Sequence, residues 1–166
     1  MKLLLFSDTH RRLDCCYAAL EEHPDCEGVL HLGDVEQDAQ RLAKTAGVPV
    51  TAVCGNNDYF HPQYPAYDIL ELDGVRVFLT HGHNYGVRSG DFFRLARAAV
   101  QNGCQIALFG HTHIPYLGEL DGITLCNPGS AAFGYYGVLT QEYGEIQIAL
   151  YPGGQTKNFK SDRKDG

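Results

Sequence analysis

Five short clusters of Asp, Asn and His carry the chemistry that this sequence could perform. Each cluster directly follows a segment that we expect to be a β-strand. The clusters are Asp8-Thr9-His10, Gly33-Asp34, Gly55-Asn56-Asn57-Asp58, His81-Gly82-His83 and Gly110-His111-Thr112-His113. Ligands of α/β proteins gather at the carboxyl ends of strands. We therefore expect the five clusters to converge on one site.

The side chains of these clusters are those that bind divalent transition metals. Carboxylate, imidazole and amide groups without thiolates favour Mn²⁺, Fe²⁺, Ni²⁺ or Zn²⁺ over a structural zinc site built from cysteines. The clusters also offer more ligands than one ion needs. A carboxylate can bridge two ions about 3.5–4 Å apart, which is the arrangement used in two-metal phosphoester hydrolysis. This chemistry predicts a dinuclear metal site.

The elements that position the clusters begin with alternating strands and helices. Apolar runs predict strands over residues 2–6, 29–32 and 49–54. Helical spacing predicts a helix that begins near Leu13 and ends before Pro24, and a second helix over residues 36–46. Such alternation is typical of a parallel βαβ unit. A helix over residues 91–101, capped by Ser89, and a strand over residues 106–110 follow later in the chain.

Three hairpins supply antiparallel strands as well. Asp73-Gly74 and Asp121-Gly122 are strong two-residue turn signals between strands, and Glu142-Tyr143-Gly144 separates a third pair. This amount of strand predicts an α/β fold with two packed mixed β-sheets flanked by helices. We expect a single domain over residues 1–166, with residues 152–166 as a surface tail.

Composition excludes several classes of protein. The chain has 166 residues, 44% of them hydrophobic, which is enough for a folded core. Its net charge of −7 argues against a protein that tracks long nucleic acids. No apolar run reaches the roughly 20 residues of a membrane span, and the apolar start is too short for a signal peptide. Six cysteines without paired spacing predict free thiols and a cytoplasmic location.

The ordered motif series resembles that of the calcineurin-like metallophosphoesterases, which reads DxH, GD, GNH(D/E), a lone H and GHxH. The resemblance runs from the first strand to about Ser130. The short length and Asn127-Pro128-Gly129-Ser130 are similar to the small one-domain, YfcE-type branch. This resemblance implies a two-sheet sandwich with outer helices, in agreement with the strand pattern.

The resemblance also implies a role for each motif residue. Asp34 would bridge two divalent ions, with Mn²⁺ favoured and Ni²⁺, Fe²⁺ or Zn²⁺ as alternatives. One ion would be held by Asp8, His10 and His113, and the other by Asn56, His81 and His111. A hydroxide bridging the ions would attack a small phosphoester, a phosphodiester rather than a monoester. Relatives of this size often self-associate, so a homo-oligomer stays open.

One position departs from the family pattern. Asn57 stands where the family has a histidine assigned to leaving-group protonation, and Asn cannot act as a general acid. We therefore expect substrates with good leaving groups. Asp58 is a candidate carboxylate behind the ligands. His83 either supports the ligands or substrate, or is solvated in its loop, and His31 is expected in the core.

The alternative function is that of a scaffold or interaction protein with a vestigial metal site. The retromer subunit of this fold is such a module. All seven ligand positions of this sequence keep residues that can bind metal, a set that a scaffold does not need. We therefore favour the enzyme.

Overall fold

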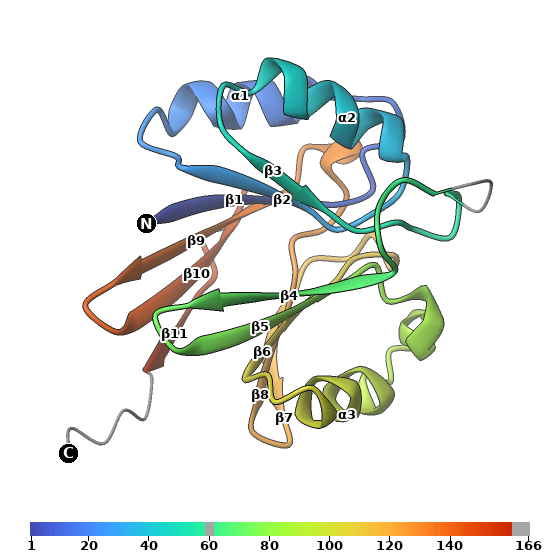
Figure 1. Ribbon diagram of the computed structural model, residues 1–166, viewed down its shortest axis with the longest axis vertical. Helices are drawn as coiled ribbons and strands as arrows, with labels where there is room; N and C mark the ends of the chain where they lie inside the picture. Colours follow the sequence, from blue (N-terminus) through green and yellow to red (C-terminus); the bar gives the residue numbers. More distant parts are fainter. Residues whose placement is uncertain (59–61, 161–166) are drawn as a thin grey trace.

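The computed structural model describes residues 1–58 and 62–160 and has four layers. Helices α1 (Asp14–Glu22) and α2 (Glu36–Thr45) cover one sheet. That sheet packs on a second sheet, whose outer face is covered by α3 (Phe93–Gln101). Figure 1 shows the two sheets stacked between these helices. This architecture confirms the predicted pair of mixed sheets with flanking helices.

The first sheet has six strands in the order β11-β10-β9-β1-β2-β3. Its parallel part joins β1 to β2 and β2 to β3, and its antiparallel part runs from β1 through β9 and β10 to β11. The strands are β1 (Lys2–Phe6), β2 (Gly28–His31), β3 (Val50–Ala52), β9 (Tyr136–Glu142), β10 (Glu145–Tyr151) and β11 (Thr156–Lys160).

The second sheet has five strands in the order β4-β5-β6-β8-β7. Strands β5, β6 and β8 are parallel, and β4 and β7 are antiparallel edge strands. The strands are β4 (Tyr67–Leu72), β5 (Val75–Thr80), β6 (Ile106–Leu108), β7 (Tyr116–Leu120) and β8 (Ile123–Asn127). Both Asp-Gly turns lie where predicted, and all four of their residues have positive φ, as type I′ turns require.

Short 3₁₀ helices lie beside the site: η1 (His83–Tyr85), η2 (Val87–Ser89) and η3 (Ala131–Phe133). The prediction that Ser89 caps α3 is wrong. Ser89 ends η2, where its hydroxyl donates to the Gly86 carbonyl at 3.0 Å. The carboxylate of Asp91 instead accepts the Phe93 N–H at 2.9 Å, because it lies close enough to the first turn of α3 to bond it.

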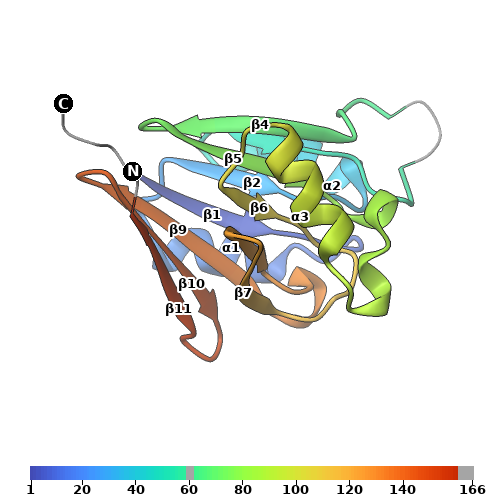
Figure 2. The same cartoon turned by 90° about the horizontal axis from the view of Figure 1, so that it is seen from below.

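Three apolar clusters hold the layers together. The largest lies between the sheets and includes Leu5, Leu32, Val77 and Leu108, each fully buried or nearly so. A second joins the first sheet to α1 and α2, and a third joins the second sheet to α3. Figure 2 shows α3 lying across the second sheet. The central cluster fixes the two sheets relative to each other, and therefore fixes the strand ends that carry the polar clusters.

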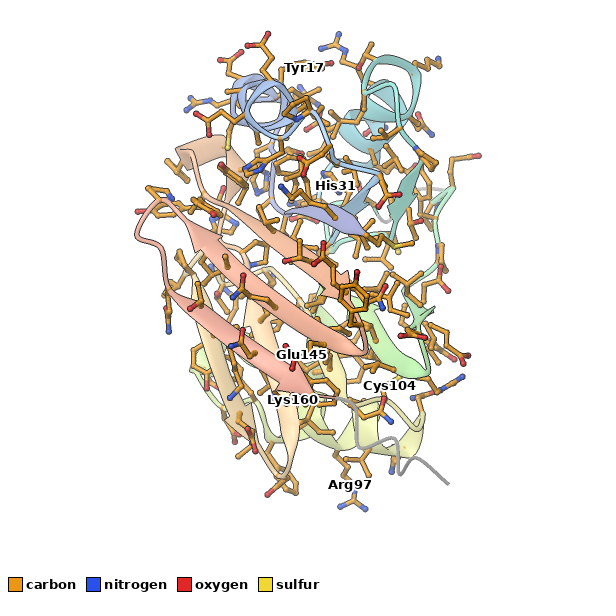
Figure 3. The ribbon with its side chains drawn as sticks, turned by 90° about the vertical axis from the view of Figure 1, so that its left-hand side faces the viewer. Tyr17, His31, Arg97, Cys104, Glu145 and Lys160 are labelled. Atoms are coloured by element: carbon orange, nitrogen blue, oxygen red, sulfur yellow. The ribbon has the colours of Figure 1, made fainter. Side chains whose placement is uncertain are left out.

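Strand β11, which the sequence analysis did not predict, follows Pro152 and returns the chain to the first sheet. Strand β11 pairs with β10 in antiparallel register, with Glu145 opposite Lys160. The Lys160 Nζ lies 3.2 Å from the Glu145 carboxylate, and Figure 3 shows these two side chains on adjacent strands. The predicted tail thus contains an exposed edge strand, and its residues 161–166 lie outside the described residues.

All six cysteines are free, as predicted. Five are buried and Cys15 is half-buried, so they act as small apolar side chains. Among the helices of the described residues, none is both long and apolar enough to cross a membrane.

Candidate functional site

The ends of five strands bring the predicted ligands together. Asp8 follows β1, Asp34 follows β2, Asn56 follows β3, His81 follows β5 and His111 follows β6. Five side chains at these strand ends form two overlapping groups, and within each group the ligand atoms lie within 4.8 Å of one another. These groups are Asp8, His10 and His113, and Asp8, Asp34 and His81. Asn56 joins the second group, because its Oδ1 lies 3.1 Å from the His81 Nε2.

Asp8 lies at the centre of both groups. Its Oδ2 accepts hydrogen bonds from the Ser7 hydroxyl and, at 3.0 Å, from the His111 backbone N–H. Its Oδ1 is buried and has no hydrogen-bond partner among the described residues. Three imidazole Nε2 atoms surround this oxygen, those of His113 at 3.1 Å, His10 at 3.6 Å and His81 at 3.6 Å.

This arrangement fits a bound cation. Buried polar atoms nearly always have a partner, so an orphaned carboxylate oxygen among imidazoles calls for a positive charge. Oxygen and imidazole donors together are typical ligands of divalent transition metals. The residues of the site therefore suit the divalent ions that the sequence predicts.

His81 is held in the orientation that a metal ligand needs. Its Nδ1–H donates to the Leu32 carbonyl at 2.8 Å, which leaves the Nε2 lone pair of the neutral ring facing Asp8 and Asp34. Burial opposes protonation of this ring. The neighbouring Asp34 and Asp8 carboxylates outweigh burial and raise the pKa of His81. The pocket thus favours a positive charge at this point.

Asn57 holds the Asp34 carboxylate with two hydrogen bonds. Its backbone N–H donates to Oδ1 at 3.1 Å, and its side-chain Nδ2 donates to Oδ2 at 2.8 Å. Burial would raise the pKa of Asp34, but His81 and these bonds from Asn57 keep that pKa well below its usual range. Asp34 is therefore ionised and fixed in orientation. Sequence reasoning did not foresee this contact of Asn57.

Five of the seven candidate ligands have left-handed backbone conformations. The φ angles are 53° for Asp8, 43° for His10, 50° for Asp34, 71° for His111 and 64° for His113. Positive φ is uncommon for residues other than glycine and concentrates at functional sites, where the surrounding structure enforces it. Asp and His adopt this conformation more readily than most residues, so the signal lies in the gathering of five such backbones around one site.

Two glycines allow the ligand loops to approach closely. A side chain at Gly55 would overlap the Asp34 carboxylate, and one at Gly110 would overlap Ser7 and the Asp8 carboxylate. The motifs therefore need glycine at these two positions to leave room for the ligands.

Asp58 and His83 lie beside the ligands in different ways. Both oxygens of Asp58 accept backbone N–H groups, from Glu36 at 2.9 Å and from Gly55 at 2.8 Å, so it ties α2 to the Asn56 loop. The His83 ring lies 5.5 Å from that of His81 and 6.2 Å from that of His111. Burial, and then His81, lower the pKa of His83, and its buried Nδ1 has no partner in the described chain. This packing against the ligand rings favours the supporting role over a solvated loop.

His31, Thr9 and Asp38 form a buried hydrogen-bond network behind the site. The sequence predicted that His31 lies in the core, but it did not predict these bonds. The Gly33 N–H donates to the His31 Nδ1 at 3.3 Å, so His31 donates through Nε2 to the Thr9 hydroxyl at 3.1 Å. Thr9 donates in turn to the Asp38 carboxylate at 2.6 Å. Figure 3 shows His31 between the strands and the helix layer. The network locks the Asp8–His10 loop to α2, and its partners are too distant in sequence to be read from spacing.

His31 should make the protein sensitive to acid. Burial lowers its pKa to about 4, below the ordinary value of about 6.5. As the pH falls from about 6.5 to 4, the unfolded chain binds a proton that the native state excludes, so stability decreases. The loss from this residue approaches about 3 kcal/mol at pH 4. Urea unfolding between pH 7 and 4 should show a shallower decline for His31→Gln than for the native chain, and equal slopes would refute this role.

The fold and the site together define a class of protein. Two mixed sheets lie between helices, with Asp and His side chains gathered at the strand ends. The chain belongs to the calcineurin-like phosphoesterase superfamily, whose domain model matches residues 1–143.

Curated relatives and solved structures agree with this family. The chain is 32% identical over 134 residues to a probable metallophosphoesterase of Methanothermobacter thermautotrophicus, covering 78% of this chain and 77% of the relative. It is 30% identical over 156 residues to the phosphodiesterase YfcE of Escherichia coli, covering 80% of each. The structure of vacuolar protein sorting 29 from Cryptosporidium parvum shares the fold, with a TM-score of 0.76, 22% identity and 96% coverage of each chain.

Proposed function

We propose that this protein is a phosphodiesterase that uses two divalent metal ions, with Mn²⁺ favoured, to hydrolyse a small phosphoester. The observation that carries the proposal is the orphaned Oδ1 of Asp8 among three imidazole nitrogens. The family and the phosphodiesterase name of one relative support the class of reaction.

The ligands divide between two positions. We assign Asp8, His10 and His113 to the first ion, Asn56, His81 and His111 to the second, and Asp34 to both. Ions held here would supply a hydroxide nucleophile at neutral pH and neutralise the charge of the phosphoryl oxygens. The left-handed backbones of five ligands and the close approach at Gly55 and Gly110 support this common site.

The other residues of the site orient these ligands. The Leu32 carbonyl fixes the His81 ring, Asn57 fixes the Asp34 carboxylate, and Asp58 fixes the loop that begins at Gly55. The Asn57 side chain is an amide, so it cannot act as a general acid toward the leaving group. This favours esters with good leaving groups, and hence diesters over alkyl monoesters.

A scaffold with a vestigial metal site is the rival function, and a solved structure of a vacuolar sorting protein has the same fold. Metal content and turnover separate the two functions. The purified protein, stripped with chelator and reloaded with Mn²⁺, Ni²⁺, Fe²⁺ or Zn²⁺, should bind two ions per chain and hydrolyse bis-p-nitrophenyl phosphate faster than p-nitrophenyl phosphate. A folded protein that binds no ions and cleaves neither ester would support the scaffold.

We also propose that the chain acts as a single domain in the cytoplasm. The six unpaired cysteines support a reducing compartment. The central apolar cluster, which joins strands from both sheets, supports one cooperative unit. Size-exclusion chromatography with light scattering would decide between a monomer and a homo-oligomer.

A further inference from the structure

A depression of about 500 Å³ lies between the loop after β1 and the first turns of α2. It is lined by Arg11, Val35, Gln37, Asp38 and Arg41. Arg11 directly follows the ligand His10, and Val35 directly follows the ligand Asp34. Two separate loops of the metal site therefore each contribute the next residue to this depression, so it adjoins the site on the side of α2.

The depression carries an excess of positive charge in an acidic protein. Arg11 and Arg41 are both exposed, and no carboxylate of residues 1–58 or 62–160 lies within ion-pair distance of either guanidinium. The one carboxylate in the lining, that of Asp38, is buried and already engaged. Its Oδ2 accepts hydrogen bonds from the Thr9 hydroxyl at 2.6 Å and from the Arg11 backbone N–H at 2.7 Å.

The backbone holds two of the lining residues in strained conformations. The φ angle is 68° at Arg11 and 53° at Val35. A left-handed conformation is a genuine outlier for a β-branched residue such as valine, and glycine would relax it at either position. In this conformation the Arg11 N–H donates to the Asp38 carboxylate, which supports the turn, and Arg11 lines the depression. Strain that the structure enforces in this way is typical of functional sites.

We propose that this arginine pocket binds a second phosphate group of the substrate, on the part of the phosphoester that does not leave. The inference rests on the proposed function, because it names the class of diester that the same site hydrolyses. Guanidinium groups present planar pairs of N–H donors that match phosphate oxygens, and two arginines line this one depression. The preferred substrate is then a phosphodiester whose retained alcohol carries a terminal phosphate a short distance from the scissile bond.

The test compares two diesters that differ in one group. 3-Phosphooxypropyl p-nitrophenyl phosphate carries the second phosphate, and propyl p-nitrophenyl phosphate has hydrogen in its place. We expect the metal-loaded protein to prefer the phosphorylated ester by at least about tenfold in kcat/KM, since hydrogen bonds to charged groups are the strong ones. Arg11→Gln and Arg41→Gln should each remove most of this preference. Arg11→Gly, which relaxes the backbone, should do the same without loss of thermal stability.

Arg12→Gln is the matched control, because Arg12 is also exposed but lines a different surface depression with Cys15 and Ala132. The preference should survive in this variant. If Arg12→Gln loses the preference for the phosphorylated ester as fully as Arg11→Gln does, the effect is one of general surface charge, and the proposal of a phosphate-binding pocket is wrong. Equal turnover of both esters by the native chain would overturn it too, while leaving the proposed function intact.

A failure of the proposed function gives a different result. In that case neither ester is cleaved by the metal-loaded protein. Titration calorimetry of the metal-free protein with propyl phosphate then still tests the pocket. Binding that is lost in Arg11→Gln and kept in Arg12→Gln supports it, and no binding to the native chain overturns it.

Discussion

An Asp8→Asn protein is expected to lose at least the first metal ion, which Asp8 shares with His10 and His113, and to hydrolyse bis-p-nitrophenyl phosphate at least about 10³-fold more slowly. The amide oxygen must accept the bonds that Ser7 and His111 now give to Oδ2, because the amide NH₂ cannot accept them. The NH₂ then faces the three imidazole nitrogens around Oδ1, where it cannot bind a cation. Removing one donor of an oxyanion hole typically slows an enzyme about 10²–10³-fold, and loss of a metal ion that neutralises the same charge should cost at least as much. Elemental analysis after gel filtration, with initial rates, measures both effects.

Two further variants make this prediction sharper. Ser7→Ala removes only a donor to the other oxygen of Asp8, so it should keep both ions and most of its activity. Asp34→Asn keeps Asp8 in place and should lose at least one ion, because a bridging carboxylate balances two cations. If Asp8→Asn still binds two ions tightly, Asp8 is not a ligand and the assignment of the site is wrong.

Introducing histidine at position 57 should change which leaving groups the protein expels. General acid catalysis is typically worth 10²–10⁴-fold, and an alkoxide needs a proton that a nitrophenolate does not. Asn57→His should therefore raise kcat/KM for alkyl phosphodiesters by about 10²-fold relative to nitrophenyl esters. The measurement is the slope of log kcat/KM against leaving-group pKa, which should become shallower.

The structure adds a control to this experiment. The Asn57 side chain also holds the Asp34 carboxylate at 2.8 Å, so any replacement disturbs a ligand. Asn57→Ala removes that bond without adding an acid, and it should lower all rates while keeping the native slope. Parallel plots for Asn57→His and the native chain, at equal metal content, would show that water or another group already donates the proton.

Local sequence signals were enough to predict most of the fold and the close approach of Asp8, Asp34 and His81. The Asp73-Gly74 turn set the register of β4 and β5, because only a tight turn with positive φ fits between the two strands. Convergence of the ligands followed from a general rule about strand ends and needed no knowledge of side-chain packing. Asp8 and His111, for example, are brought within hydrogen-bond distance by the topology of two different sheets.

The features that escaped prediction depend on contacts between distant parts of the chain. Strand β11 has a polar sequence and gains its conformation by pairing with β10, so Thr156–Lys160 carries no strand signal of its own. The cap of α3 depended on where η2 ended, which spacing cannot show. The contact of Asn57 with Asp34 joins residues 23 positions apart and has no local pattern.

The left-handed backbones of the ligands also bear on how this protein can evolve. Each such residue costs about 1 kcal/mol or more relative to a relaxed conformation, and glycine would recover part of that free energy at every one. Selection for stability alone would therefore favour glycine at positions 8, 10, 34, 111 and 113, and none of them is glycine. The side chains kept at these positions therefore fit the proposed metal site better than a purely structural role. Selection of variants of this protein for thermostability alone would therefore favour glycine at these positions, and each such substitution would remove a side chain of the proposed metal site.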